Sequence, residues 1–213
     1  MSVQSRQIAY DIFHTLMRNR DLVPGQLVTQ KELLAMMGVT QNPLRGALAR
    51  LEVEGFLTIL PQHGIKLIEP SLKAFKNVTQ IRIAIEKEAW NHFAFSAPEG
   101  RLGKWIEEHE AFLEECQSRI TPELLVRFSE YDQGMHHIVI NAMENERIAD
   151  LFRVALVTTL FMRPDRGYVR AYTIKNTIQE HIEVLRAAEK QDIPSLLPAI
   201  ERHLMGAVQR FVV

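Results

Sequence analysis

Apolar residues recur every three or four positions along most of this chain, a spacing that predicts a protein made mainly of α-helices. The alternation of apolar and polar residues that is typical of β-strands is confined to residues 56–68. There the segments 56–60 and 65–68 flank a turn at 61–64, so we expect a hairpin of two short strands. Pro70 ends this region, and Ser71 is a favourable cap for a following helix.

Three helices are predicted before the hairpin, the first over about residues 2–20. The second begins at the capping-box sequence that runs from Thr29 to Glu32, and it ends at Gly38. The third begins at Thr40, so only a tight turn separates the two. Short helices joined in this way and followed by a hairpin are typical of a winged helix-turn-helix. The expected apolar stripes are Ile8, Ile12, Leu16 and Met17 on the first helix, and Leu44, Ala47, Leu48 and Leu51 on the third.

Residues from 71 onward have the periodicity of successive helices. Helix-breaking or helix-starting residues interrupt this region at 96–100, 121–122, 144–145, 164–167 and 191–194. About six helices are therefore expected in an all-α bundle. The predicted fold is mainly α, with a winged helix-turn-helix domain over residues 1–72 and a helical domain over residues 73–213.

Composition is ordinary for a globular protein, with 46% hydrophobic and 24% charged residues. No apolar run is long enough to span a membrane, and the first ten residues lack a secretory apolar core. A single cysteine, Cys116, excludes an internal disulfide, so we expect a cytoplasmic protein. The net charge is −1, and residues 1–70 carry seven Lys or Arg against six Asp or Glu. Any DNA contact must therefore be argued from the positions of the charges.

The third helix carries polar residues that project away from its apolar stripe near its N-terminus, the end that enters the major groove in this motif. Arg45 can pair with guanine, and Gln41 or Asn42 can pair with adenine. Polar residues on an exposed helix are usually just solvated, so the pattern alone leaves an ordinary helical domain open as well. The candidate DNA contacts are Lys31, Thr40, Gln41, Asn42, Arg45, His63 and Gly64.

Histidines are the informative residues of the second region. Asp132 and His136 are one helical turn apart at the edge of an apolar stripe, and His181 and His203 fall within the stripes of two later helices. A buried carboxylate is costly unless it is paired, and one carboxylate with three imidazoles suits Zn, Ni, Mn or Fe. A lone buried histidine is more often a hydrogen-bonded core residue, so both interpretations stay open at this point.

A set of short motifs runs through the first region in a fixed order: Pro24-Gly25-Gln26-Leu27, Glu32-Leu33-Leu34, Gly38-Val39-Thr40, Pro43-Leu44-Arg45, Ala47-Leu48, Leu51, Glu54-Gly55-Phe56 and His63-Gly64. On these residues, the region resembles the N-terminal domain of the GntR family of transcription regulators. The resemblance implies a double-stranded operator DNA as partner, with DNA contacts at Lys31, Gln41, Arg45, His63 and Gly64. Members often have arginine at the first two of these positions, so we expect an operator unlike the common one of the family.

Three segments of the second region surround the candidate ligands: Asp132-Gln133-Gly134-Met135-His136, Glu180-His181 and Arg202-His203-Leu204. On these segments, the region resembles the helical FCD domain of the FadR-type branch of that family, although Met135 stands where an aromatic residue is usual. The resemblance implies a divalent metal ion, zinc first and Ni, Mn or Fe as alternatives, and a small organic acid as effector. The implied ligands are Asp132, His136, His181 and His203.

Arg82 matches an arginine that is frequent in this branch, where it can clamp a second carboxylate of the effector. A salt bridge with Glu86, one turn further along the helix, is an equally good interpretation. The expected protein is a repressor that binds a two-fold operator as a homodimer. The alternatives are a metal-dependent enzyme acting on a small carboxylate and a regulator with a purely structural metal. No HExxH-type hydrolase motif is present and an enzyme would leave the winged helix unexplained, so we expect no catalysis.

Overall fold

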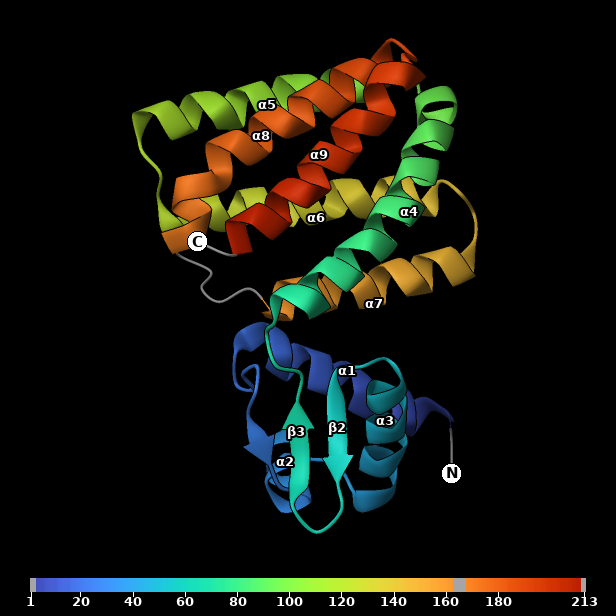
Figure 1. The fold of residues 1–213 in the computed structure, drawn as a ribbon, viewed down its shortest axis with the longest axis vertical. Helices are drawn as coiled ribbons and strands as arrows, with labels where there is room; N and C mark the ends of the chain where they lie inside the picture. Colours follow the sequence, from blue (N-terminus) through green and yellow to red (C-terminus); the bar gives the residue numbers. More distant parts are fainter. Residues whose placement is uncertain (1–2, 163–167, 212–213) are drawn as a thin grey trace. The chain divides into compact units, whose positions relative to one another are not determined.

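The computed structural model describes residues 3–162 and 168–211 of the chain, and it confirms the prediction of a mainly helical protein (Figure 1). Two compact units can be distinguished, Met1–Phe75 with Leu156–Arg163 and Lys76–Ala155 with Pro164–Val213. The elements are α1 (Val3–Asn19), β1 (Leu27–Val28), α2 (Gln30–Met37), α3 (Gln41–Val53), β2 (Leu57–Leu60), β3 (Gly64–Leu67), α4 (Leu72–Ser96), α5 (Arg101–Ser118), α6 (Pro122–Asn141), α7 (Glu146–Met162), α8 (Tyr168–Glu189) and α9 (Ile193–Phe211).

The first unit holds a winged helix-turn-helix, in which α1 packs against α3 and α3 packs against β2. The capping box predicted at the start of α2 is present. Thr29 Oγ1 accepts from the Glu32 amide at 3.2 Å, and Glu32 Oε2 accepts from the Thr29 amide at 2.7 Å. Gly38 ends the helix in a left-handed conformation. The predicted core face of α3 is confirmed, because Leu44, Ala47, Leu48 and Leu51 are buried.

The hairpin is confirmed to within one residue at each strand, but the expectation that strands are confined to residues 56–68 was wrong. A third strand, β1, pairs antiparallel with β3, with Val28 opposite Ile65, and the sheet order is β1-β3-β2. Two residues are too few to show an alternating pattern, so β1 has no signal of its own in the sequence.

The apolar stripe expected on α1 was also partly wrong. Ala9, Tyr10, Phe13 and Met17 are buried, whereas Ile8 is 51% exposed. Two stripes with helical spacing lie next to each other on this helix. The stripe that carries the two aromatic rings faces the core, because these rings bury the larger apolar area.

The helices α4 to α9 confirm the predicted six in the second region, as far as the structure describes it. In Figure 1, α8 lies between α5 and α9, and it packs against both of them and against α6. An apolar cluster joins α5, α6 and α8 through Cys116, Phe128 and Ile178. The break predicted at 164–167 lies outside the described residues. Within the described part of the chain, no helix is long and apolar enough to cross a membrane.

Candidate functional site

The predicted DNA contacts are all on the surface of the first unit. Lys31, Thr40, Gln41, Asn42, Arg45 and His63 are exposed, and Gly64 is half-buried. Thr40 is the N-cap of α3, but its side chain makes no capping hydrogen bond. The start of α3 thus presents polar side chains on the face opposite its buried leucines, the arrangement that a recognition helix requires.

Gly64 begins the second strand of the wing with a φ of 114°, a conformation that L side chains rarely adopt. A Cβ atom at this position would lie 2.8 Å from the Val28 carbonyl oxygen. The structure therefore gives Gly64 a role within the sheet, where it lets β1 and β3 approach closely. His63 beside it is held at the turn, where its Nδ1 lies 2.8 Å from the Pro61 carbonyl oxygen.

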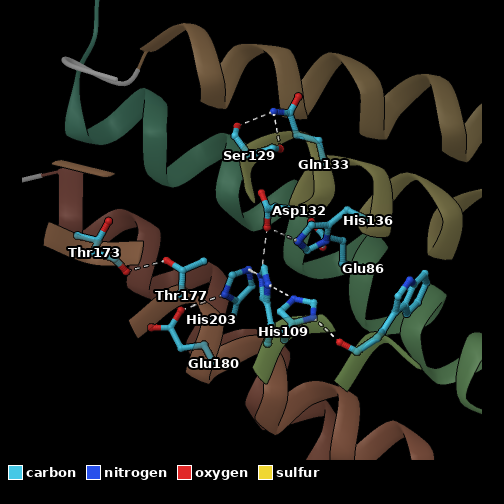
Figure 2. Close-up of polar contacts among 12 residues, drawn as sticks. Glu86, His109, Ser129, Asp132, Gln133, His136, Thr173, Thr177, Glu180 and His203 are labelled. Carbon is cyan, nitrogen blue, oxygen red and sulfur yellow. Dashed lines mark hydrogen bonds and ion pairs between the residues drawn. The ribbon is translucent and has the colours of Figure 1, made fainter. Parts of the chain in front are cut away.

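The four predicted metal ligands come together inside the helical unit, and Figure 2 labels Asp132, His136 and His203 among them. Asp132 and His136 lie on α6, His181 on α8 and His203 on α9. Asp132 Oδ1 is 3.2 Å from His181 Nε2 and 3.6 Å from His136 Nε2. The Nε2 atoms of His181 and His203 are 3.2 Å apart. Neighbouring donors that each lie about 2.1 Å from one ion are about 3.0 to 3.4 Å apart. One ring nitrogen from each of the three histidines lies within 4.8 Å of the others, so the histidines could hold one metal ion after small shifts, with Asp132 beside two of them.

Carboxylates outside this cluster contact the second ring nitrogen of two histidines. His136 Nδ1 lies 2.6 Å from Glu86 Oε2, and His203 Nδ1 lies 3.0 Å from Glu180 Oε2. A carboxylate only accepts, so each Nδ1 carries a proton, and in the neutral ring of His203 the Nε2 is bare. The Nε2 of His136 faces the Asp132 carboxylate and becomes a metal ligand once its own proton is lost. With both Nδ1 protons held by outer carboxylates, the two Nε2 atoms are the nitrogens left for a cation.

Burial disfavours the charged form of each titratable group in the cluster. The charges of the neighbouring groups then determine whether the pKa ends above or below its ordinary value. Burial lowers the pKa of His136, but the Glu86 carboxylate outweighs it and raises that pKa to about 9. Burial raises the pKa of Asp132, but His136 holds it well below its usual range. Burial lowers the pKa of both His181 and His203. The ionised Asp132 and the neutral His181 and His203 are thus in the protonation state that binds a metal, whereas His136 must first lose a proton.

Arg82 forms a salt bridge with Glu86, which is one of the two roles predicted for it. Its Nε lies 2.7 Å from Glu86 Oε1, and both side chains are buried, at 6% and 1% exposure. Burial raises the pKa of Glu86, but the charges of Arg82 and His136 lower it to about 2. Since the other oxygen of Glu86 contacts His136, this carboxylate links Arg82 to the predicted metal site. A contact between Arg82 and an effector stays a prediction.

Comparison with known proteins decides the family. Residues 5–67 match the profile of the bacterial regulatory proteins of the gntR family, and residues 77–206 match that of the FCD domain. The chain belongs to the GntR family. It is therefore a DNA-binding transcription regulator with an FCD ligand-binding domain, and not an enzyme.

Among curated relatives, this GntR regulator is 23% identical to the HTH-type transcriptional repressor RspR of Escherichia coli K12, over 93% of this chain and 83% of that protein. Two solved structures share its fold. A GntR transcriptional regulator from Rhodococcus sp. RHA1 superimposes with a TM-score of 0.72 at 14% identity, covering 99% of this chain and 98% of that one. E. coli McbR/YncC gives a TM-score of 0.68 at 16% identity, covering 100% and 98%.

Three residues around the histidine cluster of this GntR regulator are not among the predicted ligands. Glu86 is predicted only as a partner of Arg82, and Glu180 only as a neighbour of His181 in sequence. His109, on α5, is not predicted at all. Its signal was the same as for His181, because it falls in the apolar stripe that Leu102 and Trp105 begin. In the structure His109 is fully buried, and its Nε2 lies 3.1 Å from His181 Nδ1.

Proposed function

We propose that this regulator senses a small organic acid at a divalent metal ion held by Asp132, His136, His181 and His203. The observation that carries the proposal is the convergence of the Asp132 carboxylate and the histidine Nε2 atoms from α6, α8 and α9. Zinc is the first choice for such a donor set, and Ni, Mn or Fe are alternatives.

The side of the cluster next to Asp132 is where we place the effector. The Asp132 side chain is 25% exposed, whereas the three histidines are buried. A small molecule can therefore approach along α6 rather than through the packed core. When bound, the metal supplies a positive charge for a carboxylate of the effector. Arg82 is the candidate for a second carboxylate, and to serve in this way it must share its guanidinium between the effector and Glu86.

At the other end of the chain, we propose that α3 enters the major groove of the operator. Bases in that groove are read by Arg45, Gln41 and Asn42. Phosphate is contacted by Lys31 and Thr40. The minor groove is approached by the wing at His63 and Gly64. A cytoplasmic homodimer is proposed, since a two-fold operator is read by two such units. Repression is the proposed sign of regulation, by analogy with the E. coli relative, the transcriptional repressor RspR.

In this proposal, effector binding controls DNA affinity because the effector has different affinities for two conformations of the protein. The acid binds one conformation of the dimer more tightly than the other, and the population of DNA-binding conformations shifts by that difference. Couplings of this kind change affinity by about 5- to 150-fold.

The test begins with an operator selected from random DNA duplexes by the Zn-loaded protein. A panel of mono-, di- and tricarboxylates is screened by thermal shift on this protein and on the His203→Ala variant. Acids that stabilise only the Zn-loaded wild type, and that change its operator Kd by at least about fivefold, are the expected result. Acids that stabilise both proteins equally, or that leave operator Kd unchanged, would overturn the proposal.

A purely structural metal is the second candidate, and the burial of the three histidines favours it. In that case chelation unfolds the helical unit, and no carboxylate in the panel alters operator binding. The same screen therefore separates the two functions.

A further inference from the structure

A fourth buried histidine lies behind the proposed metal ligands. His109 is on α5 and has no solvent exposure. Its ring packs edge-on against Tyr131 and Phe128, with centroid distances of 5.1 and 6.2 Å. A polar ring in such a place costs free energy unless its nitrogens are hydrogen-bonded, and both of them are.

The two hydrogen bonds of His109 have a direction. Its Nδ1 lies 2.7 Å from the Trp105 carbonyl oxygen, which only accepts, so Nδ1 carries the proton. In the neutral ring, Nε2 is then an acceptor, and it lies 3.1 Å from His181 Nδ1. The His181 Nδ1 therefore donates to His109. The remaining nitrogen of His181, Nε2, is left bare and faces Asp132 Oδ1 at 3.2 Å.

We propose that His109 is a positioning residue that holds His181 in the tautomer and ring orientation needed to bind the metal ion, without contacting that ion itself. This inference rests on the proposed metal site. It places His109 in the role that Glu86 has for His136 and Glu180 for His203, so each of the three histidine ligands has an outer partner on its Nδ1. Partners of this kind typically change metal affinity by about 10- to 100-fold.

His109 differs from the other two partners because it is neutral. A carboxylate beside His181 would add negative charge to the buried centre, which already holds Asp132 and Glu86. A histidine that is itself oriented by a backbone carbonyl supplies an acceptor without a charge. The Trp105 carbonyl belongs to the same helix, so α5 fixes the direction of the whole chain of bonds.

Two substitutions separate the hydrogen bond from the packing. In His109→Gln, the side-chain oxygen can accept from His181 Nδ1 at about the place of the lost Nε2. In His109→Phe, the ring and its contacts are kept, but the acceptor is lost. His92→Phe is the matched control, because exposed His92 on α4 also bonds a backbone carbonyl, that of Ala142 at 3.0 Å.

The first measurement is the Kd of the full-length chain for Zn²⁺, from competition with a chromophoric chelator. We expect His109→Phe to weaken binding by about 10- to 100-fold, and His109→Gln and His92→Phe to remain within a few-fold of wild type. Unchanged affinity in His109→Phe would overturn the inference, and so would equal losses in the Phe and Gln variants. If the wild-type chain binds no Zn²⁺, the proposed metal function falls as well.

The second measurement reads the tautomer directly in the metal-free chain. Long-range ¹H–¹⁵N NMR spectra of the histidine rings distinguish a protonated from a bare ring nitrogen. We expect His181 to carry its proton on Nδ1 in wild type and in His109→Gln, and to populate the other tautomer in His109→Phe. An Nε2-protonated His181 in wild type would contradict the inference even if Zn²⁺ binds tightly, because such a result leaves the proposed metal site intact.

Discussion

Glu86 Oε2 lies 2.6 Å from His136 Nδ1, and the other oxygen of the same carboxylate lies 2.7 Å from Arg82 Nε. One buried anion thus pairs with two cationic groups, an arginine on its own helix and a histidine of the proposed metal site, and Asp132 lies beside that histidine as a second carboxylate. This arrangement explains why an acidic side chain with 1% exposure can remain ionised.

Removal of this charge should be costly to the fold. We expect Glu86→Gln to lower the free energy of unfolding of the metal-free chain by about 3 to 5 kcal/mol, because it leaves the buried Arg82 without a counter-charge. Urea denaturation followed by circular dichroism measures the loss. The control is Lys104→Ala, which removes an exposed pair of the same i, i+4 spacing to Glu108 and should cost less than about 1 kcal/mol. Similar losses in both variants would show that Glu86 does not act as a buried counter-ion.

Binding of Zn²⁺ near neutral pH should release a proton from His136. The pKa of this histidine, about 9 in the folded chain against 6.5 for the ordinary side chain, keeps it charged in the metal-free protein. A metal ligand must be deprotonated, so about one proton leaves for each ion bound at a pH between these values. Because folding raises the pKa of His136, the charged side chain stabilises the metal-free fold fully below pH 6.5, and this contribution is lost as pH rises through 9.

Isothermal titration in two buffers that differ in ionisation enthalpy measures the number of protons released. At pH 7.5, the difference between the two observed enthalpies, divided by the difference between the two buffer ionisation enthalpies, should correspond to about one proton per Zn²⁺. Identical enthalpies would mean that His136 is already neutral before the metal binds.

Arg45 should be needed for DNA recognition. We expect Arg45→Ala to weaken binding to the selected operator by about 1 to 3 kcal/mol, about 5- to 150-fold in Kd, since a bidentate contact to guanine is lost. Fluorescence anisotropy with a labelled duplex gives the Kd at a stated salt concentration. Arg18→Ala is the control, because it removes an equal charge outside α2, α3 and the wing. Equal Kd values for the two variants would remove Arg45 from the interface.

Gly64→Ala should destabilise the wing more than Gly38→Ala destabilises the turn between α2 and α3. Both glycines have positive φ, 114° and 63°, but only at Gly64 would a Cβ meet backbone, the Val28 carbonyl oxygen at 2.8 Å. Gly38→Ala should cost about 1 kcal/mol, and Gly64→Ala more, because the strand pairing must also shift. Thermal unfolding of the two variants makes the comparison. A larger loss for Gly38→Ala would mean that β1 does not constrain the wing.

Much of this architecture could be predicted because the signals were local. The capping box at Thr29 and the buried leucines of α3 follow from spacing within a few residues, and the structure confirms them. The strand β1 could not be predicted, since two residues carry no periodicity and its pairing with Ile65 is a tertiary contact. On α1, two apolar stripes of equal spacing compete, and only packing decides that Phe13 faces inward rather than Ile8.

The histidine cluster likewise has features that could be predicted from the sequence and features that could not. Helical periodicity predicts that Asp132, His136, His181 and His203 face the interior, but it could not show how close their atoms lie. One ring nitrogen from each histidine lies within 4.8 Å of the others, and Asp132 Oδ1 lies 3.2 Å from His181 and 3.6 Å from His136. The outer partners were harder still, because Glu86 and His109 lie on helices separated from the ligands by long stretches of sequence. Their roles depend on which atom of each ring faces which neighbour, and a sequence pattern carries no such information.

The most direct test of the proposed metal centre is a crystal structure of the Zn²⁺-loaded chain with diffraction data collected on both sides of the zinc absorption edge. We predict a single anomalous peak about 2.0 to 2.2 Å from Asp132 Oδ1 and from the Nε2 atoms of His136, His181 and His203. A stoichiometrically bound zinc ion located elsewhere, or a helical unit with no zinc peak between these four side chains, would contradict the account.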